Sequence, residues 1–100
     1  MISPPTHETW VWVFVQNAGT NAQYVGQHDE MGGVSFIPAF FEKDAAQQCL
    51  PRIVPAPHPS CEVQAVRFGD LEADAASNGF MIFMLNPDGG IIHKIQPSAI

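Results

Sequence analysis

The stretch Trp10–Val15 constrains the fold more than any other part of the sequence, because its six residues are all β-branched or aromatic. Such side chains fit the pleated surface of a strand better than they fit a helix. Side chains alternate along a strand, so one face takes Trp10, Trp12 and Phe14 and the other takes Val11, Val13 and Val15. Because both faces are apolar, this strand is predicted to lie in the centre of a sheet. Phe80–Leu85 is a second run of six apolar residues and gives the same prediction.

Two segments have the patterns of helices. Residues 41–50 place apolar side chains three or four positions apart on one stripe, and Pro51 is expected to stop this helix. Residues 70–78 form the second helix, with Asp70 expected as the N-cap and Gly79 as a left-handed C-terminal cap.

Shorter runs predict the remaining strands, at residues 22–27, 34–37, 61–68 and 91–95. Pro38 is expected to end one of them, and a turn at residues 16–21 joins the first two as a hairpin. The predicted order is β-β-β-α-β-α-β-β. This indicates an α+β fold, a two-layer mixed β-sheet with two short helices on one face. Some parallel pairing is expected, because strand and helix alternate in the middle of the chain.

The chain of 100 residues is long enough for one domain with a real apolar core. Residues 10–96 are predicted to form this single α+β domain. Residues 1–9 are expected to be a flexible N-terminal arm and residues 97–100 a tail. The proline-rich stretch at residues 55–59 is a stiff connection, too short to link two domains.

The chain is strongly acidic, because it contains ten Asp and Glu but only four Lys and Arg, for a formal net charge of −6. Nucleic-acid binders neutralise phosphates with clustered basic residues, so we expect no nucleic-acid partner. An anionic membrane surface is disfavoured for the same reason, and no apolar run is long enough to span a bilayer. The acidic surface then serves either solubility or the docking of a partner.

The two cysteines, Cys49 and Cys61, are expected to be reduced thiols, with a bridge between them as the alternative. Residues 1–9 lack the basic and apolar regions of a signal peptide. The sequence therefore predicts a soluble cytoplasmic protein.

Part of the sequence resembles the N-terminal domain of SseB-like proteins. The matching pieces are Pro38-Ala39-Phe40, the helix at residues 42–50, the strand at residues 63–68, and Leu85-Asn86-Pro87. They cover about half of the chain. The resemblance implies a compact α/β module without assigned enzymatic chemistry, and it transfers no catalytic residue.

Two segments carry the candidate ligand-binding residues. His28, Asp29 and Glu30 form the densest group of polar side chains, suited either to a metal or acid–base site or to a solvated loop. Asn86, Asp88 and Gly89 belong to a turn whose backbone N–H groups are suited to an anion, although Asn, Asp and Gly are also what tight turns need. No complete catalytic, metal-binding or nucleotide-binding signature is present, so neither enzymatic activity nor a cofactor is expected.

Two functional hypotheses follow. The first is a non-enzymatic protein-interaction or regulatory module that binds a protein partner or forms a homodimer, through an apolar sheet face or the acidic helix surface. The alternative is a small ligand-binding or metal-dependent domain that uses the segments at residues 28–30 and 86–90.

Overall fold

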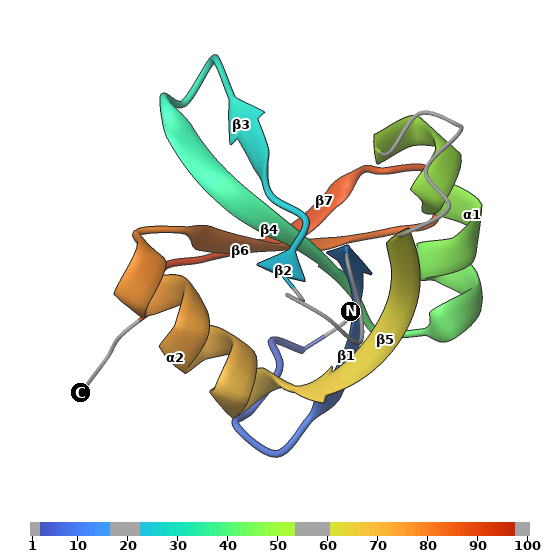
Figure 1. Ribbon diagram of the computed structural model, residues 1–100, viewed down its shortest axis with the longest axis horizontal. Coiled ribbons are helices and arrows are strands. Elements are labelled where there is room, and N and C mark those ends of the chain that lie inside the picture. The colour runs from blue at the N-terminus through green and yellow to red at the C-terminus, as the bar shows by residue number, and fades with distance from the viewer. Residues whose placement is uncertain (1–2, 17–22, 54–60, 98–100) are drawn as a thin grey trace.

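The computed structural model describes residues 3–16, 23–53 and 61–97, and these form an α+β fold (Figure 1). Within the described residues there are seven strands in one mixed sheet and two helices. The predicted fold class is therefore confirmed. Most of the turn predicted at residues 16–21 and the whole connection at residues 55–59 lie outside the described residues.

Strand β1 (Trp10–Gln16) lies in the interior of the sheet, which confirms the prediction from its apolar run. Strand β5 (Cys61–Arg67) pairs antiparallel with β1 along its whole length. On the other side, β1 pairs with β2 (Gln23–Tyr24) at its end and with β4 (Val34–Phe40) near its middle. The predicted hairpin of the first two strands is thus confirmed.

Strand β4 connects this half of the sheet to the other half. It pairs in parallel with β6 (Met81–Leu85), and β6 pairs antiparallel with β7 (Ile91–Ile95). The parallel pair confirms the expectation of a mixed sheet. Strand β3 (Gln27–Asp29) pairs with the first half of β4. The segment predicted as one strand at residues 22–27 thus becomes β2 and β3, because its two parts pair with different neighbours.

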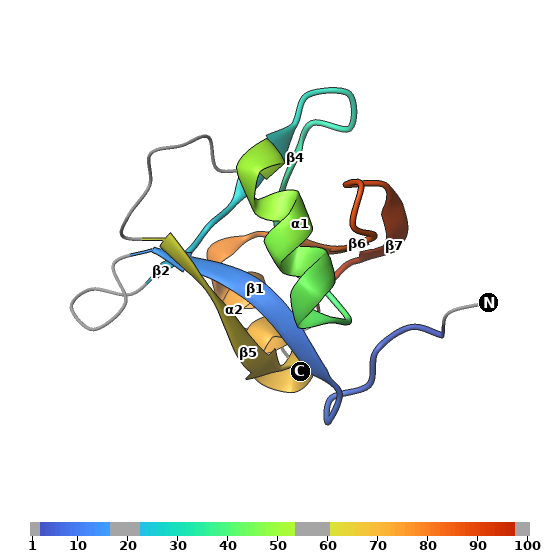
Figure 2. The same ribbon diagram turned by 90° about the vertical axis from the view of Figure 1, so that its right-hand side faces the viewer.

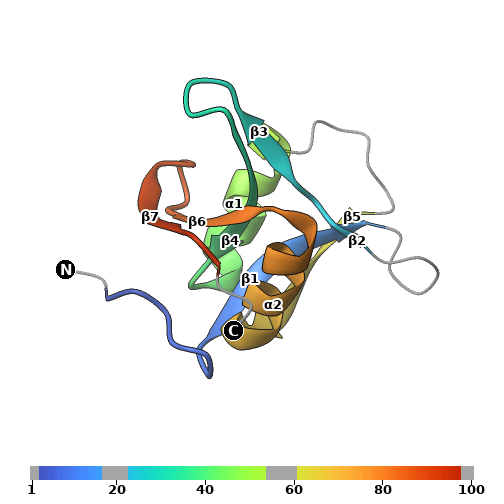
Figure 3. The ribbon, with the colours of Figure 1, turned by 90° about the vertical axis from the view of Figure 1, so that its left-hand side faces the viewer.

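The two helices lie on opposite faces of the sheet, with α1 in front of the sheet in Figure 2 and α2 in front of it in Figure 3. Helix α1 (Lys43–Ile53) buries Ala45, Ala46 and Cys49 against Phe14, Phe40 and Phe83. Helix α2 (Phe68–Asn78) buries Phe68, Leu71 and Ala75 against Val11, Val13, Ile82 and Met84. This differs from the expected two layers with both helices on one face. The physical reason is that the central strands are apolar on both faces, so each face needs a cover that excludes water.

Two prolines lie inside elements that the sequence predicts them to end. Strand β4 continues past Pro38, which is fully buried and lies opposite Phe83 in the parallel ladder. Helix α1 continues past Pro51 to Ile53. Each proline removes one backbone donor. The missing donor of Pro38 lies within a well-packed strand, and that of Pro51 lies in the last turn of its helix. Each element tolerates the loss of one donor and continues past its proline.

The start of α2 is capped by the N-terminal segment. Helix α2 begins at Phe68, so Asp70 lies in its first turn and the prediction of Asp70 as N-cap is wrong. The backbone N–H groups of Phe68 and Gly69 donate to the carbonyl oxygens of Thr9 (2.8 Å) and His7 (2.9 Å). These carbonyls satisfy helix donors that a side chain would otherwise cap. The predicted N-terminal arm therefore contacts the domain.

The end of α2 is capped as predicted. Gly79 has a left-handed φ of 75°, and its N–H group points at the carbonyl oxygens of Ala75 and Ala76. Glycine takes this conformation without the steric cost of a Cβ, so the helix ends at Asn78. Within the described residues, neither helix has the length and apolar character needed to cross a membrane.

Candidate functional site

Five of the six predicted ligand-binding residues line one hollow of about 510 Å³, which we name the β3–α1 hollow. They are His28, Asp29, Glu30, Asp88 and Gly89. The first three belong to β3 and the turn that follows it, and the last two belong to the turn between β6 and β7. Arg52 and Ile53, at the end of α1, form a third side.

The floor of the β3–α1 hollow is apolar. Phe36 and Phe83 stack with ring centroids 4.2 Å apart and an interplanar angle of 10°. Leu85 and Ile53 extend this floor toward β7 and the end of α1. The wall from β3 is tied to the helix, because the Gln27 side-chain amide donates to the Ile53 carbonyl oxygen at 3.3 Å.

The rim of the hollow is charged, with Asp29, Glu30, Asp88 and Arg52 around it. Three carboxylates against one guanidinium make this rim acidic. The Asp29 carboxylate also shapes the turn, since its Oδ1 atom accepts the N–H groups of Met31 (3.1 Å) and Gly32 (3.3 Å). His28 is exposed beside Ser35, with its Nδ1 atom 3.5 Å from the hydroxyl oxygen. These side chains are accessible to a molecule that enters the hollow.

Exposed apolar side chains flank the same hollow. Met31 is fully exposed and Ile91 is 49% exposed, and both line it. Only one other large apolar side chain, Trp10, is exposed in the part of the chain that the structure describes. Trp10 lies elsewhere, under the Arg67 guanidinium. Exposed apolar side chains next to a polar rim mark surfaces that bind other molecules.

Asn86, the sixth predicted residue, shapes the turn instead of lining the hollow. Its Oδ1 atom accepts the N–H groups of Asp88 (3.0 Å) and Gly90 (2.8 Å). Gly89 has a left-handed φ of 87°, so the turn needs a residue without a Cβ at this position. The Asn-Pro-Asp-Gly-Gly sequence is thus explained by the turn itself.

Both cysteines are free thiols. Burial raises the pKa of the Cys49 thiol, with Arg52 opposing the shift and Asp88 adding to it. Burial, followed by the charge of Glu62, also raises the pKa of the Cys61 thiol. A raised pKa keeps a thiol protonated and weakly nucleophilic. Within residues 3–16, 23–53 and 61–97, no three His, Cys, Asp or Glu side chains are grouped as metal ligands.

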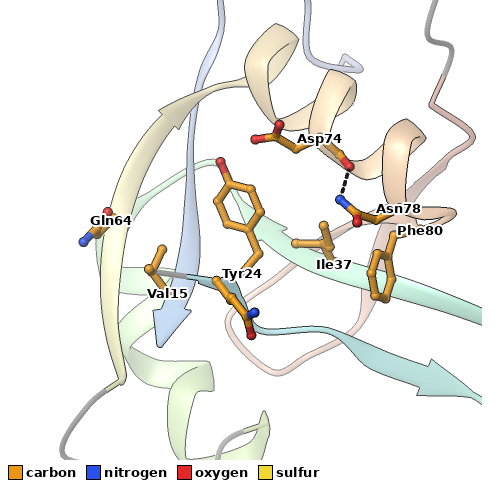
Figure 4. Close-up of a pocket in the computed structure, with 8 residues that line it drawn as sticks. Val15, Tyr24, Ile37, Gln64, Asp74, Asn78 and Phe80 are labelled. Carbon is orange, nitrogen blue, oxygen red and sulfur yellow. Dashed lines mark hydrogen bonds between the residues drawn. The ribbon is translucent and has the colours of Figure 1, made fainter. Parts of the chain in front are cut away.

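A second hollow, of about 550 Å³, lies between α2 and the sheet (Figure 4). We name it the Tyr24 hollow. Its described lining residues are Val15, Gln23, Tyr24, Ile37, Gln64, Asp74, Asn78 and Phe80. The Tyr24 hydroxyl points from β2 toward the Asp74 carboxylate on α2. The pKa of Tyr24 is raised first by burial and then by the charge of Asp74, by a hydrogen bond to that carboxylate, and by the charge of Asp70.

Sequence reasoning missed the Tyr24 hollow. Its lining residues come from β1, β2, β4, β5, α2 and the connection between α2 and β6, and no two of the polar ones share a recognisable motif. The one local signal is that Tyr24 is the single tyrosine of the chain. That signal has no meaning until the fold places Tyr24 beside α2.

No family model, no curated protein and no solved structure matches the chain. The resemblance to SseB-like proteins therefore stays a prediction. The function of this chain is therefore inferred from the β3–α1 hollow and the Tyr24 hollow, and from the chemistry of the described residues that line them.

Proposed function

We propose that this chain is a protein-interaction module whose β3–α1 hollow binds a segment of a partner protein. The observation that carries the proposal is the position of Met31 and Ile91, two exposed apolar side chains on the rim of a hollow with an aromatic floor. Interface cores are enriched in aromatic residues and Met, and Met adapts its shape to different apolar partners. An apolar anchor side chain of the partner would enter between them and contact Phe36, which is stacked on the buried ring of Phe83.

The charge of the rim selects the chemistry of that segment. Glu30 and Asp88 lie on different sides of the hollow, and each offers a carboxylate to the groups next to the anchor. Lys or Arg beside the anchor would complement them, and complementary charges raise association rates and specificity more than affinity. We therefore expect one apolar anchor flanked by basic residues.

A second copy of this chain fits the hollow less well. The chain has a net charge of −6 and only four Lys and Arg. Three of these lie over aromatic rings of the chain itself, Lys43 over Trp12, Arg67 over Trp10 and Lys94 over Phe83. The fourth, Arg52, lines the hollow. Both central faces of the sheet also carry a helix, so neither is left for a homodimer. The partner is therefore a different protein.

The test is selection from a displayed peptide library against the immobilised protein, followed by affinity measurements on synthetic peptides. We expect enriched peptides to share one Leu, Met or aromatic residue flanked by Lys or Arg. Replacing the anchor by Ala should weaken binding at least about tenfold, since an interface hot spot contributes about 2 kcal/mol or more. Peptides enriched without a common anchor, or with acidic flanks, would contradict the proposal.

A matched variant pair localises the binding. Met31→Ser and Ile91→Ser remove exposed apolar side chains at the hollow, and Trp10→Ser removes one elsewhere. The first two should weaken peptide binding, and the third should leave it unchanged. Sedimentation of the protein alone checks the homodimer, because a dimer that Ile91→Ser dissociates would assign the hollow to a second copy and overturn the proposed partner.

A cytoplasmic location is part of the same proposal. It is supported by the free state of Cys49 and Cys61. Alkylation of the protein inside cells, read by mass spectrometry, should modify Cys61 without prior reduction. A bridged or glutathione-capped Cys61 would argue for an oxidising compartment.

A further inference from the structure

The Tyr24 hollow has the size and lining of a small-molecule site. Its volume of about 550 Å³ lies within the range of pockets that hold metabolite-sized ligands. Such sites combine an apolar surface with a few polar groups that fix the orientation of the ligand. This hollow lies on the α2 face of the sheet, and the β3–α1 hollow lies on the α1 face. It is therefore independent of the protein-binding function proposed above.

The apolar part of the hollow comes from the sheet and from Phe80, which lies between α2 and β6. Val15 and Ile37 are almost fully buried, and Phe80 is partly buried. In Figure 4, Ile37 and Phe80 lie below α2, and Tyr24 stands beside Ile37. These side chains form a surface on which the body of an apolar or aromatic ligand can pack.

The polar part of the hollow is concentrated on one side. The Tyr24 hydroxyl points toward the Asp74 carboxylate there, and the negative charge of Asp74 acts on Tyr24. A carboxylate has two oxygens with about four acceptor positions, and a neutral tyrosine hydroxyl can accept while it donates. The two side chains therefore offer several acceptor positions to a ligand. Asn78 is held by its own bond to the Asp74 carbonyl oxygen, at 2.8 Å.

The electrostatics of the hollow favour a cation. Asp74 is the only charged residue among the described residues that line it, and none of them is Lys, Arg or His. Asp70, one turn earlier on α2, adds a second negative charge near Tyr24. An anionic ligand would be repelled by both carboxylates. A cation with an apolar body satisfies both the acceptors and the apolar surface, and the ring of Tyr24 also attracts positive charge.

We infer that the Tyr24 hollow binds a small primary amine in its ammonium form, with an aromatic or branched aliphatic body. The ammonium group donates hydrogen bonds to the Asp74 carboxylate and to the Tyr24 hydroxyl oxygen. The body packs against Ile37 and Phe80.

The experiment uses benzylammonium and isobutylammonium as probes, with benzyl alcohol and benzoate as neutral and anionic controls. Binding is followed by residue-resolved chemical shifts in amide proton–nitrogen spectra of the whole chain. We expect the two ammonium probes to shift the amides of Tyr24, Asp74 and Asn78, and the two controls to leave them unchanged. Equal binding of benzyl alcohol, binding of benzoate, or shifts confined to the β3–α1 hollow would overturn the inference.

Two matched variants test the named contacts. Asp74→Asn removes the negative charge in the hollow, and Asp70→Asn makes the same change on the same helix outside the lining. Because Asp74 is exposed, Asp74→Asn should weaken benzylammonium binding about two- to fivefold, the scale of an exposed ion pair, and Asp70→Asn should have a smaller effect. Tyr24→Phe, which keeps the ring, should weaken binding to an intermediate degree. If Asp70→Asn and Asp74→Asn weaken binding equally, or neither Asp74→Asn nor Tyr24→Phe weakens it, the site is not the one inferred.

Discussion

Replacing Asn86 by alanine should destabilise the protein, although Asn86 is partly exposed and lines neither hollow. The Oδ1 atom of Asn86 accepts two backbone N–H groups, those of Asp88 and Gly90. A neutral hydrogen bond contributes about 0.5–1.5 kcal/mol, so the loss of both predicts about 1–3 kcal/mol. A domain of this size typically has about 5–15 kcal/mol of stability, so a loss of this size is well within measurement. Urea unfolding should show a lower midpoint with an unchanged slope.

Two controls separate the acceptor from the rest of the side chain. Asn86→Asp keeps acceptor oxygens at the same place and should retain most of the stability. Asn78→Ala removes a single bond, to the Asp74 carbonyl oxygen, at the end of α2, where alanine favours the helix by about 0.5 kcal/mol. Its net effect should be close to zero. The reasoning is refuted if Asn86→Ala costs no more than Asn78→Ala, or if Asn86→Asp costs as much as Asn86→Ala.

Three further predictions concern titration, packing and thiol access. Tyr24 is the only tyrosine, so near-ultraviolet absorbance reports its ionisation alone, and its pKa should lie above 10.0 in the folded protein and fall part of the way back in Asp74→Asn. The pKa of Tyr24 is higher in the folded protein than in the unfolded chain, so protonated Tyr24 contributes fully to stability below the unfolded pKa. This contribution is lost as the pH rises through the folded pKa. If the free energy of unfolding above pH 10 has the same pH dependence in Tyr24→Phe as in the original protein, the prediction is contradicted. Phe83→Ala removes a buried ring stacked on Phe36 and should cost about 3–5 kcal/mol in urea unfolding, whereas a cost near 1 kcal/mol would mean that the ring is not packed as described. An aromatic disulfide reagent should modify the partly exposed Cys61 faster than the buried Cys49, and equal rates would show that α1 opens readily.

Most of the fold could be predicted from the sequence because its signals are local. The apolar runs that become β1 and β6 are long and uninterrupted, and both lie inside the sheet. Gly79 ends α2 because a left-handed residue is needed there. The errors arose where tertiary contacts overrule local chemistry. Pro38 continues its strand because both neighbouring residues pair with β6, and the backbone of the N-terminal segment does the capping expected of Asp70.

The placement of the two helices on opposite faces of the sheet was not predicted, although the sequence contains the signal for it. Apolar side chains on both faces of Trp10–Val15 already imply that both faces of the sheet must be covered. The expectation of two layers instead left the second face of the sheet to be covered by another subunit. In the structure one helix covers each face.

The candidate site could be predicted only in part from the sequence. The residues at 28–30 and 86–90 stand out by composition, and five of the six named residues line one hollow. The apolar floor of that hollow could not be predicted, because Phe36, Phe83 and Ile53 come from three elements. The Tyr24 hollow could not be predicted from the sequence, since Tyr24 and Asp74 come together only when α2 packs on the sheet.

The most direct test of the proposed function is a charge reversal on the rim of the β3–α1 hollow. Glu30→Lys combined with Asp88→Lys is compared with Glu42→Lys combined with Glu62→Lys, which changes the net charge equally on exposed residues outside the hollow. Calorimetric titration with a peptide that carries one apolar anchor and basic flanks should show binding at least about tenfold weaker for the first pair and little changed for the second. The first pair should instead prefer the same peptide with acidic flanks. Equal affinities of the two pairs for the basic peptide would contradict a partner-binding role for this hollow.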